Sequence, residues 1–288
     1  MSNITVVGLG AMGAALARTL IEAGRDVTVW NRSPEKMQPL VSMGAHAAPN
    51  FTEALKASPR LIVCLPDYDS TAKLFEQFDV LPLLNGHTVI QLSTATPKEA
   101  VISENWFSDH GASYLDGAIL CWPGNIGTAT GQIVVAGPEP VFADCRADLQ
   151  HLAGDLRYLG QNIRAPATLD LAFLSRTVGI IFGSIHGALV CEAEGVPVSE
   201  FTALLPAGDR AVPLTQAIND GSFDTITKAG ASVDVAGSAV TRMQQQAHDA
   251  GINSELPDLL CDWVERAQVA GYGSQETAAV IKAIRQNI

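Results

Sequence analysis

The chain has 288 residues, of which 47% are apolar and 17% charged, and it carries a formal net charge of −12. This composition describes a globular protein and excludes disordered and collagen-like chains. The negative charge argues against a nucleic-acid or anionic-membrane partner, because like charges repel. The length favours two domains.

Cysteine spacing and apolar runs predict a cytoplasmic chain in a reduced compartment. The five cysteines lie far apart without CxxC or Cys/His spacing, so we expect no disulfide framework and no metal site. The apolar start, residues 4–7, leads directly into a glycine turn, which argues against a signal peptide. No uninterrupted apolar run approaches the ~18 residues of a membrane span, so we expect no membrane partner.

Short apolar runs alternate with helical patterns over residues 1–160. Such alternation is typical of βαβ units, which form a parallel sheet with helices on both faces. The predicted fold class is α/β, with an N-terminal doubly wound Rossmann domain. A later run, Gln132–Ala136, followed by a helical stretch from Val141 to Leu152, is predicted to extend the same sheet. The five earlier predicted strands are Ile4–Val7, Asp26–Trp30, Leu61–Leu65, Thr88–Leu92 and Tyr114–Leu120.

Helical patterns fill the chain after residue 160. The stretch Ala165–Ala193 is apolar on nearly every face, which predicts a long interdomain helix buried on all sides. We place the boundary near residue 162, between a Rossmann domain (1–162) and an all-α domain (163–288). Later helices are predicted to break at proline and glycine, namely at Pro206, Pro213, Gly221, Gly237, Gly251, Pro257 and Gly271.

A helix buried on all sides needs more cover than so small a domain supplies. We therefore expect a homodimer with intertwined C-terminal domains, in which a second copy covers the helix. The alternative is that the C-terminal helices wrap around it within one monomer.

A glycine-rich turn follows the first predicted strand, with the sequence Gly8-Leu9-Gly10-Ala11-Met12-Gly13. Between a strand and a helix, this GxGxxG pattern is typical of dinucleotide-binding domains. Gly8 permits the tight turn, Gly10 lets backbone amides approach a pyrophosphate, and Gly13 lets the helix pack close to the strand. All six residues are predicted cofactor contacts, and the alternative is an ordinary glycine turn.

The end of the second predicted strand indicates which dinucleotide is bound. NAD-binding domains usually place Asp or Glu here for the ribose hydroxyls, whereas this chain has Asn31. Arg32 follows, and its guanidinium suits a 2′-phosphate, with Asn31 and Ser33 as neutral donors. The sequence therefore predicts NADP(H), and the alternative for Arg32 is a solvated loop residue.

Two further loops lie at the carboxyl ends of predicted strands, where open α/β sheets bind ligands. Leu65 and Pro66 in one loop, and Ser93 and Thr94 in the other, are predicted to flank the nicotinamide. The adjacent Asp67 and Tyr68 have two equally supported interpretations. Both residues flank the ligand, or Asp67 is a helix cap and Tyr68 is a surface aromatic.

An isolated acid, Asp170, stands near the start of the long apolar helix. A buried carboxylate is costly unless it is paired or functional. The alternative is an acid stabilised by the helix dipole.

Three segments carry a resemblance to a known family. They are the Gly8–Gly13 turn, the turn Trp30-Asn31-Arg32-Ser33, and Tyr114–Ile119 with Pro123 and Ile126-Gly127 after it. These segments resemble the β-hydroxyacid dehydrogenase superfamily, which is similar to 6-phosphogluconate dehydrogenase, and within it the imine reductase and reductive aminase branch. The resemblance covers the whole chain.

One helix position distinguishes the branches of this superfamily. The resemblance implies that hydroxyacid dehydrogenases carry a lysine there and an asparagine four residues on, whereas this chain has Asp170 and Leu174. Many imine reductases have aspartate at that position, and a carboxylate attracts a cationic iminium that a lysine would repel. The resemblance thus implies that Asp170 is catalytic.

The same resemblance implies an apolar substrate pocket for an imine or amine. Trp122 offers a face to a cation or simply packs in the core. Val178 stands where some amine-coupling relatives have tyrosine, as Thr94 stands where they have asparagine. Asp234 lies in a stretch that relatives direct toward the partner's active site, or it is a solvated helix residue. The predicted pocket residues are Leu120, Trp122, Val178 and Asp234.

These observations favour an NADPH-dependent enzyme that reduces C=N bonds of cyclic imines and iminium ions. One alternative is an NADPH-dependent reductase of a small aldehyde or keto acid, similar to β-hydroxyacid dehydrogenases. Another is a non-catalytic NADP-binding regulatory protein.

Overall fold

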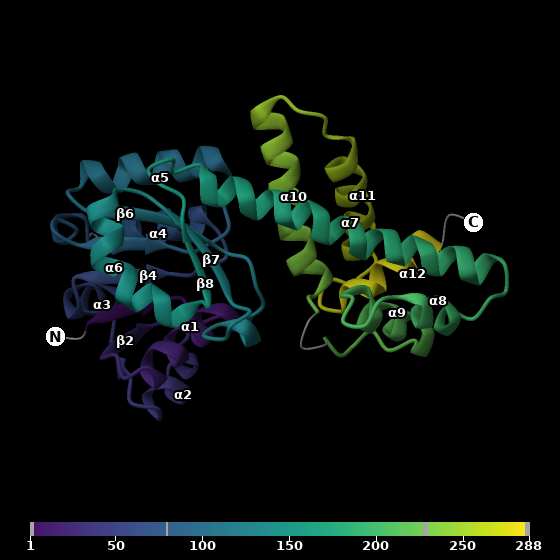
Figure 1. Cartoon of the computed structure of the whole chain (residues 1–288), viewed down its shortest axis with the longest axis horizontal. Helices are drawn as coiled ribbons and strands as arrows, with labels where there is room; N and C mark the ends of the chain where they lie inside the picture. The colour runs from purple at the N-terminus through teal and green to yellow at the C-terminus, as the bar shows by residue number, and fades with distance from the viewer. Residues whose placement is uncertain (1–2, 79, 227–229, 286–288) are drawn as a thin grey trace. The chain divides into compact units, whose positions relative to one another are not determined.

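The computed structural model describes residues 3–78, 80–226 and 230–285. The chain forms two compact units, Met1–Asp170 and Leu171–Ile288, and Figure 1 labels most of their helices and strands.

An eight-stranded sheet is the centre of the N-terminal unit, with the strand order β3-β2-β1-β4-β5-β6-β7-β8. Every pairing is parallel except that between β6 and β7. This architecture confirms the predicted Rossmann-type α/β fold. The strands are β1 (Ile4–Val7), β2 (Val27–Trp30), β3 (His46–Ala47), β4 (Arg60–Val63), β5 (Thr88–Gln91), β6 (Ser113–Ile119), β7 (Gln132–Ala136) and β8 (Asp155–Tyr158).

Three features of the sheet differ from the prediction. Strand β7 runs antiparallel to β6, because the segment between them contains only the short 3₁₀ helix η3 (Pro123–Asn125) and no crossover helix. Strands β3 and β8 were not predicted. Both are edge strands, one of two exposed residues and one with the polar sequence DLRY, so neither has the apolar signature of a central strand.

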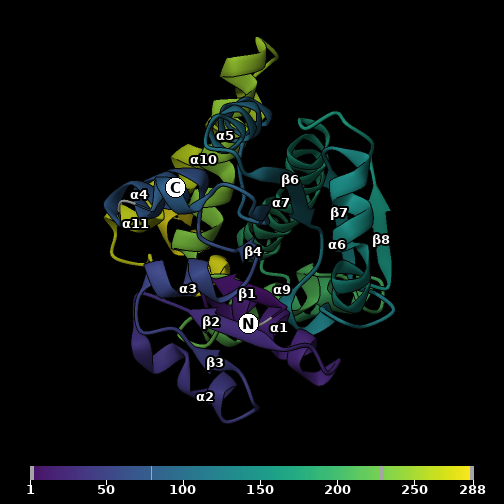
Figure 2. The ribbon, with the colours of Figure 1, turned by 90° about the vertical axis from the view of Figure 1, so that its left-hand side faces the viewer.

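Each face of the sheet is covered by its own apolar core, because successive strand residues point to opposite faces. Side chains such as Val6 and Val29 pack against α1 (Ala11–Glu22), α2 (Gln38–Val41) and α6 (Glu139–Leu152). Neighbours such as Val7 and Val63 pack against α3 (Phe51–Ala57), α4 (Tyr68–Gln77) and α5 (Pro97–Asp109). Figure 2 shows α3 and α4 on one side of β1 and β4, and α1 and α6 on the other.

The long helix α7 spans Ala165–Ala193, the range predicted from its apolar stretch. Within this chain it is not buried on all sides as expected, since Leu169 and Val190 are 44% and 52% exposed. Its length and composition would suit a membrane span, although core helices of soluble proteins share both properties.

The described part of the C-terminal unit consists of helices around one apolar core. Residues of α7 such as Phe182 and Ile185 pack there against Val240 and Val264. The further helices are α8 (Val198–Leu204), α9 (Ala211–Asp220), α10 (Val233–Ala250), α11 (Glu255–Val269), the 3₁₀ helix η4 (Thr277–Ala279) and α12 (Val280–Ile284).

Three of the expected helix breaks are wrong. Pro213 and Pro257 lie in the first turns of α9 and α11, where a missing N–H costs no helical hydrogen bond. Gly237 lies inside α10, where a Cβ would come 3.0 Å from Val264 Cγ1 of α11. Glycine therefore serves close helix packing at this position and does not end the helix.

Candidate dinucleotide and catalytic site

The glycine turn joins β1 to α1 with close backbone contacts. Gly8 has φ +90°, and its N–H donates to the Trp30 carbonyl at 3.0 Å. A Cβ at Gly13 would lie 1.9 Å from the Gly8 carbonyl oxygen, so only glycine fits. Gly10 is the N-cap of α1, and it is exposed together with Ala11. The turn therefore presents the positive end of α1 to solvent, as phosphate binding requires.

The Asn31 side chain holds this turn. Its Oδ1 accepts the Leu9 N–H at 2.9 Å, and its Nδ2 donates to the Ser33 carbonyl at 3.2 Å. Arg32 next to it is exposed and has no hydrogen bond or ion pair to the described residues. A free guanidinium thus lies beside the glycine turn, while Asn31 already uses its oxygen and one N–H within the protein.

The two loops after β4 and β5 run side by side. Asp67 and Thr94 form an isolated parallel bridge, and the Leu65 N–H donates to Ser93 Oγ at 2.9 Å. The Ser93 hydroxyl also lies 2.8 Å from Gln91 Oε1, so this serine ties the loops together. Both loops therefore present their residues at one edge of the sheet.

Asp67 is the helix cap of α4 that one alternative predicted, since its carboxylate accepts the Ser70 N–H at 2.7 Å. The expectation of a surface aromatic at Tyr68 is wrong, because Tyr68 is only 7% exposed.

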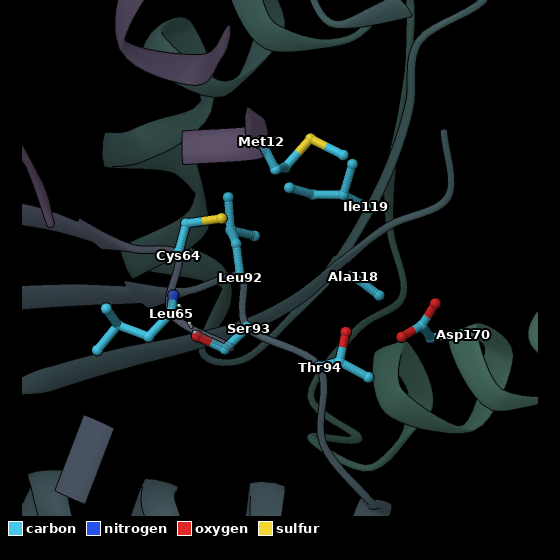
Figure 3. A pocket seen from close by; sticks show the side chains of 9 residues that line it. All are labelled: Met12, Cys64, Leu65, Leu92, Ser93, Thr94, Ala118, Ile119 and Asp170. Atoms are coloured by element: carbon cyan, nitrogen blue, oxygen red, sulfur yellow. Dashed lines mark hydrogen bonds between the residues drawn. The ribbon is translucent and has the colours of Figure 1, made fainter. Parts of the chain in front are cut away.

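A cavity of about 180 Å³ lies at the carboxyl ends of the strands, within the N-terminal unit. Figure 3 shows Thr94, Ala118 and Asp170 on one side of it, and Cys64 and Leu65 on the other. The complete lining is Met12, Cys64, Leu65, Leu92, Ser93, Thr94, Ala118, Ile119 and Asp170. Among the described residues, no group of three or more His, Cys, Asp or Glu side chains is placed to hold a metal ion.

The structure brings five of the predicted site residues to this cavity, namely Met12, Leu65, Ser93, Thr94 and Asp170. Four lining residues were not predicted: Cys64, Leu92, Ala118 and Ile119. Each lies at or directly beside the carboxyl end of a strand, so the rule that located the loops could have found them.

The remaining predicted site residues do not line the cavity. Pro66 is exposed, and Leu120 and Trp122 are half-buried in the segment after β6. Val178 and Asp234 belong to the C-terminal unit, where Val178 is part of the core. Asp234 is exposed in the first turn of α10 and accepts a hydrogen bond from Gln268 Nε2 at 2.9 Å. The substrate roles of these residues stay predictions.

Asp170 is the acid of the cavity. Its side chain is buried, and among the described residues it makes no hydrogen bond. Burial raises the pKa of its carboxyl from 3.8 to about 7. The group is thus available in both protonation states near neutral pH, which suits general acid catalysis. The Cys64 thiol opposite stays neutral, since burial raises its pKa to about 12.

A buried polar cluster behind the cavity was also missed by the sequence analysis. Tyr68 donates a short hydrogen bond to Asp116 Oδ1, and Tyr114 Oη lies 3.3 Å from that same oxygen. Strand periodicity alone marks Asp116 as an acid in a central strand, which is a signal that could have found it.

The glycine turn, the exposed guanidinium and the cavity define a dinucleotide-binding protein. Residues 3–160 match the NAD binding domain of 6-phosphogluconate dehydrogenase, and residues 162–286 match the C-terminal domain of NADPH-dependent reductive aminase-like proteins. The chain belongs to the imine reductase and reductive aminase family, as its sequence motifs predicted.

Three relatives illustrate this similarity. An NADPH-dependent reductive aminase of Aspergillus oryzae is 27% identical, over 97% of this chain and 96% of its own. An imine reductase from Myxococcus stipitatus, solved with NADP+, is 28% identical, with a TM-score of 0.70 and coverage of 98% and 99%. A reductive aminase from Aspergillus terreus, solved with a cofactor, cyclohexanone and allyl amine, is 30% identical, with a TM-score of 0.67 and 99% of each chain covered.

Proposed function

We propose that this protein is an NADPH-dependent oxidoreductase that reduces the C=N bond of cyclic imines and iminium ions to amines. The observation that carries the proposal is Asp170, a buried carboxyl in a cavity that also borders Met12 of the glycine turn. The family relationship supports the same activity.

The residues present fit NADP(H). Gly8, Gly10 and Gly13, together with Leu9, Ala11 and Met12, would hold the pyrophosphate at the start of α1. Arg32 would bind the 2′-phosphate, with Ser33 as a donor and Asn31 shaping the turn. Leu65, Pro66, Ser93 and Thr94 would flank the nicotinamide. The cofactor supplies the hydride that reduces the substrate carbon.

Asp170 would act on the nitrogen of the substrate. Reduction of C=N adds a hydride to carbon and a proton to nitrogen, and the protonated Asp170 carboxyl would supply that proton. Its pKa near 7 leaves a substantial protonated fraction at neutral pH. A lysine at this position would repel a cationic iminium, so Asp170 disfavours the hydroxyacid-type reductase. An acid in the cavity likewise disfavours a purely regulatory protein.

We assign the rest of the substrate pocket to Leu120, Trp122, Val178 and Asp234. The apolar members suit an amine carrying hydrocarbon groups, and Trp122 would offer an aromatic face to a cationic nitrogen. Thr94 and Val178 stand where amine-coupling relatives carry asparagine and tyrosine, so we favour reduction of a preformed cyclic imine over coupling of ketone and amine.

The direct test is NADPH oxidation with a small cyclic imine beside a small keto acid. We expect turnover of the imine and none, or far less, of the keto acid, because Asp170 replaces the acid-binding lysine. Oxidation of NADPH with the keto acid but not with the imine would instead indicate a hydroxyacid-type reductase. Binding of NADPH without turnover of either substrate would indicate a regulatory protein.

We further propose a cytoplasmic homodimer with intertwined C-terminal domains. The support is exposed apolar surface in the C-terminal unit, where Val190, Val235, Ile252 and Val269 are all at least half exposed. A second copy of the chain would cover these side chains and remove their apolar surface from water. The domain boundary near residue 162 is part of the same proposal.

Light scattering is expected to give twice the chain mass at micromolar concentration. An active monomer would contradict the proposed dimer, because α7 would then need no second copy. Val269→Asp, at the most exposed of these residues, should shift the equilibrium toward monomer, whereas the matched change Ile102→Asp, at an exposed position of α5 in the N-terminal unit, should not.

A further inference from the structure

Gln91 is a buried polar side chain at the end of β5, next to the cavity but outside its lining. It is 0% exposed. Its Nε2 donates to Thr71 Oγ1 of α4 at 3.0 Å, and its Oε1 accepts the Ser93 N–H at 3.2 Å and the Ser93 hydroxyl at 2.8 Å. A buried amide is costly unless both of its polar ends are hydrogen-bonded, and here both are. The Gln91 side chain is therefore held between one helix and one cavity loop.

The direction of each hydrogen bond around Gln91 is fixed. The Ser93 N–H can only donate, so the amide oxygen faces Ser93 and the amide nitrogen faces Thr71. The Ser93 hydroxyl uses its hydrogen on Gln91, and its oxygen accepts the Leu65 N–H at 2.9 Å. Thr71 Oγ1 in turn donates to the Asp67 carbonyl at 3.3 Å. One chain of hydrogen bonds thus leaves the loop after β4 at Leu65, passes through Gln91 and returns to that loop at Asp67.

This chain of bonds continues the connection between the strands beyond the end of the sheet. Backbone bonds join β4 and β5 as far as the Leu92 N–H, which donates to the Val63 carbonyl at 2.8 Å. Beyond that point Ser93 Oγ joins the two loops. Ser93 and Leu65 both line the cavity, whereas Gln91 does not. Gln91 therefore acts on the cavity through Ser93.

We propose that Gln91 is a positioning residue that sets the spacing of the two loops that flank the nicotinamide. It holds Ser93 directly and Leu65 through Ser93. Hydride transfer is sensitive to such placement, because a misplacement of about 1 Å can lower a rate about 100-fold. Cofactor affinity is assigned mainly to the glycine turn and Arg32, so it should depend little on Gln91. The inference rests on the proposed function, in which these loops border the nicotinamide.

Gln91→Met tests this role, because methionine has a similar length and removes all three hydrogen bonds. In the cofactor-free protein we expect faster hydrogen exchange at the Leu65 and Ser93 amides, measured by NMR. With NADPH bound, the fluorescence anisotropy of the reduced nicotinamide should decay faster, at a nearly unchanged dissociation constant. The kcat for a cyclic imine should fall by up to about 100-fold, as expected for misplaced reactants.

Three variants at other threonines and serines separate positioning from general stability. Thr71→Val removes the acceptor of Gln91 Nε2 at a position outside the cavity, and we expect smaller changes in the same direction. Thr71→Ser keeps the hydroxyl and should behave like the native protein. Thr5→Val is the matched control, because Thr5 is a buried residue of β1 whose hydroxyl donates to the Ala54 carbonyl at 3.0 Å. It should lower the melting temperature and leave kcat and the nicotinamide anisotropy unchanged.

An unchanged anisotropy decay or an unchanged kcat in folded Gln91→Met overturns the inference. Thr71→Val decides in the same way if Gln91→Met does not fold. Equal changes in Thr5→Val and Thr71→Val also overturn it, since they would show a general loss of stability. The exchange and anisotropy measurements need no turnover, so failure of the proposed imine reduction in the native protein would be recognised separately.

Discussion

Asp170→Ala is expected to lower turnover of a cyclic imine by roughly 100- to 10,000-fold, the usual contribution of a general acid–base group. NADPH binding should stay nearly unchanged, because the cofactor is assigned to the glycine turn and the adjoining loops. Asp170→Asn should be almost as poor, since the amide keeps the volume but has no acidic proton. The measurements are steady-state kinetics and cofactor titration, with the exposed Asp144 of α6 changed to Asn as the matched control.

The pH profile of the native enzyme tests the same group. The protonated form of Asp170 is the active one, so kcat/KM for an imine should fall as the pH rises through about 7. A permanently charged N-alkyl iminium needs no proton, and its reduction should survive in Asp170→Asn. Loss of iminium turnover in that variant would instead make the carboxylate an electrostatic anchor. Full imine turnover in Asp170→Ala would make Asp170 a structural helix acid.

Arg32→Ala is expected to weaken NADPH binding by about 1.5–3 kcal/mol, the value of a hydrogen bond to a charged group. This loss corresponds to a roughly 10- to 150-fold higher dissociation constant. NADH has no 2′-phosphate, so its affinity should change little. The native protein should accordingly prefer NADPH.

Cofactor titrations of the native protein and the variant, with both nucleotides, measure this difference. Arg18→Ala, at an exposed position further along α1, removes the same charge away from the turn and is the matched control. Equal factors for NADPH and NADH in Arg32→Ala would show that the guanidinium does not bind the 2′-phosphate. Such a result would leave the proposed imine chemistry intact.

Local and periodic signals in the sequence were enough for much of this fold. The strand Ile4–Val7, the glycine turn after it and the helix Ala165–Ala193 have the predicted bounds, because each depends on residues adjacent in the chain. The carboxyl-end rule likewise placed Thr94 at the cavity, since parallel strands end at a common edge.

Other properties were decided only by contacts between distant parts of the chain. Tyr68 and Asp116 lie 48 residues apart, and no local pattern indicates that one is buried against the other. The direction of β7 and the edge strand β8 depend on which strand each one pairs with. The acidity of Asp170 was also decided in this way, because the pKa of its carboxyl is raised by burial, and burial exists only in the folded unit. The sequence by itself determined that an acid stands at the start of α7, and the tertiary structure decided that burial raises the pKa of this acid to about 7.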